Sequence, residues 1–275
     1  MCEYVKYKLK PSELAELLGE WGSRRQFEAI ANLIKEPVAY EANTHAKFLA
    51  DHSLTAHWAK LQNDANLCDT QDHIAHLHDV ATQTLTAASS ASNLEPVLFQ
   101  DTCRSLCKSL VSRAQRAYGR NNERRFVSNF NSCAEPAKQI HSQQQDVFQY
   151  LSDDRKTCAI VGKIDGFMGS DLIEIKHRTD LLRHELPVHE LMQVHAYMFA
   201  TGKQSCTVIQ CVRRLEMEAT DMMHVRFDPQ FWSSLLQRIQ RVVGFADQLS
   251  ASPLTWDSFK SCSLEEKTRL MDTYI

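Results

Sequence analysis

The stretch from Val161 to Arg178, VGKIDGFMGSDLIEIKHR, constrains the fold of this chain most strongly. Two short runs that alternate apolar and polar residues flank a glycine-bearing turn at Gly169 and Ser170, and this pattern predicts a β-hairpin or two adjacent strands of a sheet. Glu174 and Lys176 lie two residues apart in the second run, and side chains two apart on a strand point to the same face. We therefore expect a carboxylate and an ammonium group side by side on one face of a sheet.

The same hairpin would bring a second carboxylate, that of Asp165, towards Glu174. Two carboxylates at one place repel each other unless a cation lies between them, and hard oxygen ligands favour Mg²⁺ or Mn²⁺ over softer metals. The pattern therefore indicates a metal site with a lysine beside it. The alternative interpretation is an ordinary hairpin whose outward face carries solvated charges, as many exposed strands do.

The size and composition of the chain are those of a soluble globular protein. Its 275 residues are 43% apolar and 24% charged, which allows one large domain or a catalytic domain with an appended helical region. No apolar run approaches the roughly 18 residues that span a bilayer, and the first residues lack a signal-peptide pattern. Nine cysteines without a C-x₂-C pair predict free thiols in a reducing compartment. We expect an intracellular protein of the cytoplasm or nucleus, not a secreted or membrane protein.

The first third of the chain has a helical pattern and contains few strand signals. A stretch rich in Thr, Ala and Ser from 82 to 93 predicts a soft boundary, which divides the chain into a helical N-terminal region, 1–92, and a second domain, 93–275. Between Met1 and Pro37 we expect two short amphipathic helices, the second capped by Ser23. These helices have two interpretations: a small nucleic-acid-binding or partner-binding module that resembles a SAP motif, or a packing element.

Basic side chains gather between residues 104 and 125, although the net charge of the chain is −3. A helix is expected from Pro96 to Gly119, where it ends or bends, and a further helical run from Asn121 to Phe130. Glu123 would lie in the first turn of that run, where the helix dipole favours a carboxylate. The cluster is either the footprint of a polyanion or a solvated helix face. The candidate nucleic-acid contacts are Arg113, Arg116, Arg120 and Arg124.

The rest of the chain predicts a mixture of helices and strands. A helix from His189 to Thr201 should stop at Gly202, and it presents the polar ends of Gln193 and Tyr197 four residues apart on one face. Two more strands and a final helix are expected at Ser205–Val212, Met222–Phe227 and Pro229–Leu249. The pattern is weak between 132 and 152 and after residue 250. This order predicts an α/β protein of the α+β kind.

In order and spacing, these pieces resemble the PD-(D/E)XK nuclease superfamily. The nearest likeness is to the lambda-exonuclease and YqaJ-type viral recombinase group, and RecB-type nuclease domains are further off. The resemblance covers roughly 118–249, and the motifs that carry it are YGRNNERRF, VGKIDGF, LIEIKHR and MQVHAYMFATG. The chain departs from the group at Ile164, where a proline is frequent, and at His195, where a second Gln is common.

The resemblance implies a central mixed β-sheet flanked by helices and a metal-dependent active site. In such a site Mg²⁺ or Mn²⁺ would be held by Asp165, Glu174, the backbone carbonyl of Ile175 and Glu123. Lys176 would orient the attacking water and offset charge on the phosphate, and Gln193 and Tyr197 would position Lys176 or the phosphate. All six side chains are therefore candidate catalytic residues.

The function that the resemblance implies is hydrolysis of DNA phosphodiester bonds. We expect an exonuclease that acts on duplex DNA ends in recombination, repair or viral DNA processing, with a homo-oligomer and a recombination or replication protein as further partners. Two alternatives stay open: a metal-dependent RNA endonuclease of the same superfamily, and a catalytically idle nucleic-acid-binding protein on this fold. The choice between exonuclease and endonuclease, and the polarity of cleavage, are not fixed by these residues.

Overall fold

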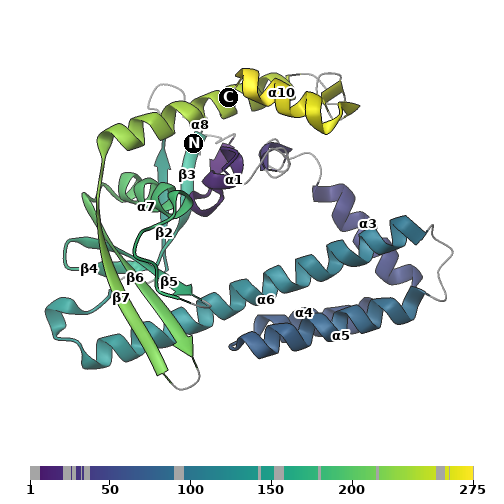
Figure 1. Cartoon of the computed structure of the whole chain (residues 1–275), viewed down its shortest axis with the longest axis horizontal. Coiled ribbons are helices and arrows are strands. Elements are labelled where there is room, and N and C mark those ends of the chain that lie inside the picture. The colour runs from purple at the N-terminus through teal and green to yellow at the C-terminus, as the bar shows by residue number, and fades with distance from the viewer. Residues whose placement is uncertain are drawn as a thin grey trace, which may run out of the picture. The chain divides into compact units, whose positions relative to one another are not determined.

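The computed structural model of the chain divides into two compact units (Figure 1). It describes residues 7–20, 26, 29–31, 33, 38–89, 96–141, 144–151, 158–178, 181–214, 217–251, 258–259 and 261–274. The α+β unit consists of Met1–Glu36 together with Ala134–Ile275, and the helical unit consists of Pro37–Cys133. In the sequence the helical unit is thus inserted into the α+β unit.

The helical unit has a hydrophobic core of its own. Its helices are α3 (Val38–Asp51), α4 (Thr55–Asn66), α5 (Gln71–Ser89) and α6 (Pro96–Cys133). Their buried side chains form one cluster, which includes Phe48, Trp58, Leu61, Ile74, Leu77, Leu85, Leu106 and Leu110. Because α6 packs against α4 and α5, the boundary predicted between residues 92 and 93 falls inside this unit. Most of the Thr/Ala/Ser-rich stretch forms the last turns of α5.

Helix α6 is continuous through Gly119, so the break predicted there is wrong. A Cβ atom at Gly119 would meet no heavy atom within 4 Å, so no close contact requires a glycine. Tertiary contacts hold the helix on both sides of it: Ala114 is buried in the core, and the Asn121 side chain donates to the Cys68 carbonyl at 3.1 Å. These contacts offset the cost of about 1 kcal/mol of a glycine inside a helix. Glu123 therefore lies well inside α6, and the helix-dipole explanation for it does not apply.

The α+β unit contains two mixed sheets. The first has the order β1-β3-β2, where β1 (Tyr7–Leu9) is parallel and β2 (Gln145–Tyr150) antiparallel to β3 (Cys158–Ile164). The second has the order β4-β5-β6-β7, formed by Gly166–Met168, Asp171–Arg178, Ser205–Arg214 and Met217–Arg226, with β5 and β6 parallel. The predicted mixed α+β class is confirmed, but the hydrogen bonds form two sheets where one central sheet was expected.

Asp165 lies where the chain passes from the first sheet to the second. Strand β3 ends at Ile164, and β4 begins at Gly166. The backbone of Phe167 exchanges hydrogen bonds of 2.8 and 2.9 Å with His141, which brings residues 140–141 against the junction. A Cβ atom at Gly166 would lie 2.6 Å from Ile140 Cγ2 and 2.8 Å from the His141 carbonyl oxygen. Only glycine fits this approach, so the sheet junction is fixed next to Asp165.

Helices α7 (Val188–Thr201) and α8 (Pro229–Ser250) pack against the two sheets through two core clusters. Helix α7 ends at Gly202, whose φ of +66° is in the left-handed region, as predicted. Helix α8 is capped by Asp228, which accepts from the Gln230 and Phe231 amides. The short α1 (Leu14–Leu17), which follows the 3-10 turn η1 (Pro11–Glu13), contributes Leu14 and Leu17 to a core cluster with α7 and α8. Met192 of α7 and Leu235, Ile239 and Val242 of α8 belong to the same cluster.

Some elements of the α+β unit were not expected from the sequence. Strands β1 and β2, the 3-10 turn η2 (Pro136–Lys138) and helix α10 (Leu264–Tyr274) were not predicted. The second of the two short helices expected before Pro37 depends on Ser23, which lies outside the described residues. Among the helices that the structure describes, none combines the length and apolarity needed to cross a membrane.

Candidate active site

Side chains from the sheet junction, β5 and α7 meet at one buried place in the α+β unit. Glu174 and Lys176 share a face of β5, and Lys176 Nζ lies 2.7 Å from Glu174 Oε1. Glu174 is only 4% exposed, and the Lys176 side chain is 19% exposed. This burial excludes the interpretation of an ordinary hairpin with solvated charges.

Gln193 of α7 closes a ring of hydrogen bonds with this pair. Lys176 Nζ donates to Gln193 Oε1 at 2.7 Å, and Gln193 Nε2 donates to Glu174 Oε1 at 2.8 Å. One turn further along α7, the Tyr197 hydroxyl hydrogen bonds with the Gln193 side chain and the Lys163 backbone. The two helix positions predicted to reach one point therefore do so, and both ends of the Gln193 amide have a fixed partner.

Asp165 is held against the same strand. Its Oδ2 accepts a hydrogen bond of 2.7 Å from the Ile175 amide. The pairing of β4 with β5 ends at Gly166 and Ile173, so beyond that pair the Asp165 side chain takes the place of a strand neighbour. The bond places Asp165 next to β5 one residue beyond Glu174.

The two carboxylates act on each other electrostatically. Burial raises the pKa of Glu174 to about 7, and the Asp165 carboxylate adds to this effect while Lys176 opposes it. Burial lowers the pKa of Lys176, but the carboxylates of Glu174, Glu190 and Asp165 outweigh burial and leave it above its ordinary value. The ammonium is therefore charged at neutral pH.

The donor set fits a hard divalent cation. Asp165 and Glu174 supply carboxylate oxygens, and Mg²⁺ is commonly bound by one or two carboxylates with water in the remaining positions. Mutual repulsion that raises the pKa of Glu174 is what such a cation would relieve. Among the residues that the structure describes, no third His, Cys, Asp or Glu joins the two carboxylates. Glu123 belongs to α6 in the helical unit, so within the α+β unit the candidate ligands are Asp165, Glu174 and the predicted Ile175 carbonyl.

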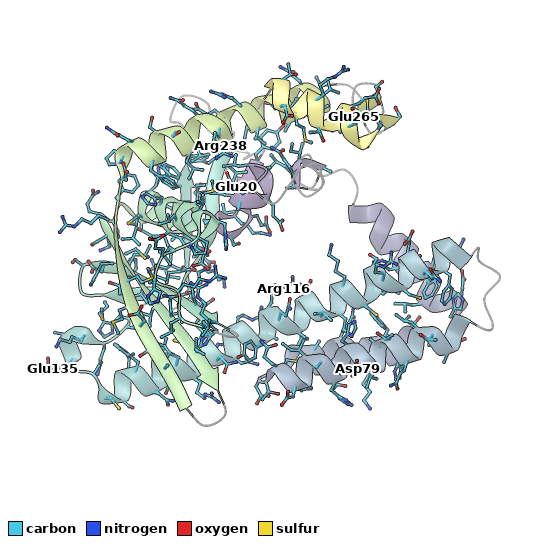
Figure 2. All side chains as sticks on the ribbon, in the orientation of Figure 1. Glu20, Asp79, Arg116, Glu135, Arg238 and Glu265 are labelled. Carbon is cyan, nitrogen blue, oxygen red and sulfur yellow. The ribbon has the colours of Figure 1, made fainter. Side chains whose placement is uncertain are left out.

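The predicted nucleic-acid contacts lie along α6 (Figure 2 labels Arg116). Arg116, Arg120 and Arg124 are exposed and four residues apart, so they follow one face of the helix. Arg113 differs because its Nε donates to Asn66 Oδ1 of α4 at 3.0 Å. We therefore assign Arg113 a structural role within the helical unit and keep the other three as candidate phosphate contacts.

A buried ion pair beside the site was not predicted from the sequence. Arg178 follows Lys176 on the same face of β5, and its guanidinium pairs with both carboxylate oxygens of Glu190, with Nη2 2.7 Å from Oε2. Their side chains are 8% and 7% exposed. Arg178 Nε also donates to Gln210 of β6 at 2.8 Å. The sequence spacing contained a signal for this pair. Arg178 lies two residues after Lys176, on the same face of the strand, and Glu190 lies three residues before Gln193, on the same side of the helix.

Comparison with known proteins gives no family for the chain. No family model matches it, and no curated protein matches it at a significant level. A solved structure described as "Crystal structure of SSO0001" is similar with 13% identity and a TM-score of 0.38, over 68% of this chain and 93% of that chain. A likeness of this degree leaves the function to be argued from the chain's own residues.

Proposed function

We propose that the protein is a Mg²⁺- or Mn²⁺-dependent nuclease of the PD-(D/E)XK type that hydrolyses phosphodiester bonds of DNA. The observation that supports this most is the buried ring of Glu174, Lys176 and Gln193 with the Asp165 carboxylate beside it. A buried lysine paired with carboxylates contributes little to stability, because desolvation offsets the attraction, and such perturbed groups cluster at functional sites.

The chain's own groups have distinct tasks in this proposal. A bound divalent cation would act as a Lewis acid and lower the pKa of a bound water, and Asp165 and Glu174 would hold it. An ammonium has three donors, and Lys176 uses two of them on Glu174 and Gln193. The described residues leave the third donor for the attacking water or a phosphate oxygen, where positive charge stabilises the transition state. Gln193 and Tyr197 fix the direction of that donor.

The proposed substrate is DNA with duplex ends, processed by an exonuclease in recombination, repair or viral DNA metabolism. The sequence resemblance favours this substrate, and the exposed row of Arg116, Arg120 and Arg124 supplies positive charge for a phosphate backbone. The cysteines of the described residues are all free, which agrees with the reducing, intracellular compartment that we propose.

The proposal is tested by digestion of end-labelled linear duplex, circular duplex and single-stranded DNA, and of RNA, with Mg²⁺, Mn²⁺ or a chelator. We expect linear duplex DNA to be degraded from its ends, only with metal, and not by Glu174→Gln. Cleavage of RNA alone would favour the RNA endonuclease alternative. Absence of both cleavage and Mg²⁺ binding by calorimetry would overturn the proposal in favour of an idle binding protein.

A further inference from the structure

A buried glutamine beside the site holds the loop that joins β5 to α7. Gln210 of β6 is 0% exposed, and its Oε1 accepts from Arg178 Nε at 2.8 Å and from the Arg183 amide at 3.2 Å. Its Nε2 donates to the Arg183 carbonyl at 2.8 Å and to Met223 Sδ at 3.0 Å. Gln210 therefore holds both backbone polar groups of a single loop residue.

The other end of the loop is fixed to the same network. Arg178 pairs with Glu190 in the first turn of α7, and His189 Nε2 lies 3.8 Å from Glu190 Oε1. A continuous set of contacts thus runs from Arg183 through Gln210 and Arg178 to the start of α7. Arg178 is two residues from Lys176 on one face of β5, so the network begins at the candidate site.

The Arg183 side chain has no role in this network. The residue is exposed, and among the described residues its guanidinium has no hydrogen bond or ion pair, because the contacts with Gln210 involve only its backbone. Burial lowers the pKa of His189, Glu190 opposes this, and Arg183, Lys176 and Arg178 lower it further. The Arg183 guanidinium and the Lys176 ammonium are therefore both close enough to His189 to act on its charge.

We propose that Arg183 binds a phosphate of the substrate backbone next to the one that is cleaved, and that Gln210 is the positioning residue that holds Arg183 there. This inference rests on the proposed function. A guanidinium is a planar fork of donors that matches phosphate oxygens. Holding its backbone at both polar groups lowers the ordering cost of binding while the fork stays accessible to the substrate.

The test compares Arg183→Ala and Arg183→Lys with Arg269→Ala, which removes an exposed arginine of the same unit on α10. Binding of a linear duplex is measured in chelator over a range of salt, and kcat and KM are measured with Mg²⁺. For Arg183→Ala we expect KM to rise about tenfold with kcat nearly unchanged, and the salt slope of binding to fall by about 0.9. Arg183→Lys should restore the slope but only part of the affinity, and Arg269→Ala should match the wild type.

Gln210→Ala adds a readout for the positioning role. Gln210→Ala should raise KM, as Arg183→Ala does, but leave the salt slope of binding unchanged. Circular dichroism checks that the variant is folded. If the wild type neither cleaves nor binds DNA, the proposed function fails and this inference fails with it. If the wild type cleaves while Arg183→Ala keeps its KM and salt slope, this inference alone is overturned.

Discussion

At the scale of single residues, the ionised form of Glu174 lowers the stability of the fold, although the proposed site needs it. Glu174 is a carboxylate with 4% exposure that hydrogen bonds to both Lys176 and Gln193, yet its ionised form is disfavoured by burial and by Asp165. In the proposed function the charged state of Glu174 would bind the cation, although burial makes that state costly for folding.

The first prediction concerns this cost. Because the pKa of Glu174 is raised from 4.5 to about 7 in the folded state, the folded protein binds more protons than the unfolded one between these values. Protonation of Glu174 stabilises the folded state fully below pH 4.5, and this stabilisation is lost as the pH rises through 7. We expect the free energy of unfolding in chelator to fall by about 3 kcal/mol across this window through this group. Urea unfolding at pH 5 and pH 8 measures it.

Glu174→Gln is the matched variant for that measurement. The amide keeps the shape of the side chain but does not titrate. The free energy of unfolding of the variant should therefore change with pH by about 3 kcal/mol less than that of the wild type. Saturating Mg²⁺ should also flatten the curve of the wild type but not that of the variant. Identical pH dependence in wild type and variant would contradict the assignment of the raised pKa to Glu174.

The second prediction concerns Lys176. Lys176→Ala should lower kcat by about 10²- to 10³-fold, because a preorganised charge at the reacting phosphate is lost. Lys176→Arg should not restore the rate, since a planar fork cannot replace a compact ammonium between Glu174 and Gln193. The control is Lys138→Ala, whose side chain is 70% exposed. Single-turnover cleavage measures the effect, and an active, folded Lys176→Ala protein would rule out the proposed role.

Much of the candidate site could be predicted from spacing alone. Glu174 and Lys176 share a strand face, and Gln193 and Tyr197 share a helix face, whatever the rest of the fold does. The bond from the Ile175 amide to Asp165 was not predictable, because it depends on where β4 stops pairing. The Arg178–Glu190 pair was missed for a related reason: it joins two elements, and spacing within either element does not reveal its partner.

At the scale of elements, strong periodicity was a good guide and short strands were not. Helices α7 and α8 and the β4–β5 hairpin lie where they were expected. Strand β1 has three residues and forms only because β3 offers it a parallel partner. Helix α10 carried a signal that was overlooked: Ser263 and Glu266 form a capping box, with Ser263 N donating to Glu266 Oε2 at 2.9 Å and Glu266 N to Ser263 Oγ at 3.2 Å.

The third prediction follows from the continuity of α6. Gly119→Ala should stabilise the helical unit by about 0.5–1 kcal/mol, because the added methyl group meets nothing and alanine loses less backbone entropy in a helix. Gly202→Ala is the contrasting variant: its φ of +66° disfavours any side chain, so it should be destabilising. Thermal unfolding followed by circular dichroism measures both. Destabilisation by Gly119→Ala would show that α6 bends there in solution.

At the scale of the whole molecule, the overall class was predictable and the division of the chain was not. The alternation of helix and strand patterns was enough for a mixed α+β assignment. The boundary was misplaced because α6 belongs with the helices before it, and that grouping depends on the packing of Leu106 and Leu110 against α4 and α5. Amphipathic patterns identify a buried face but do not identify its neighbour.

The fourth prediction concerns the charge of the helical unit. Replacing Arg116, Arg120 and Arg124 together by alanine should lower the salt slope of duplex binding by up to about 3, at about 0.9 for each phosphate contact. Arg113→Ala should leave the slope unchanged and lower stability instead, since it loses the hydrogen bond to Asn66. Fluorescence anisotropy titrations at several salt concentrations measure the slope. An unchanged slope in the triple variant would make this row a solvated helix face.

The pairing of β1 determines the order in which the molecule assembles. Tyr7 pairs with Cys158 in the parallel ladder, and its hydroxyl donates to Asp247 of α8 at 2.8 Å. A ribosome completes the whole helical insert before it makes either partner of Tyr7. The insert can therefore fold during translation, while β1 waits for β3 and α8. Cleavage in the insert after folding would leave Tyr7 in place, whereas the same cut in the nascent chain would prevent the first sheet from closing.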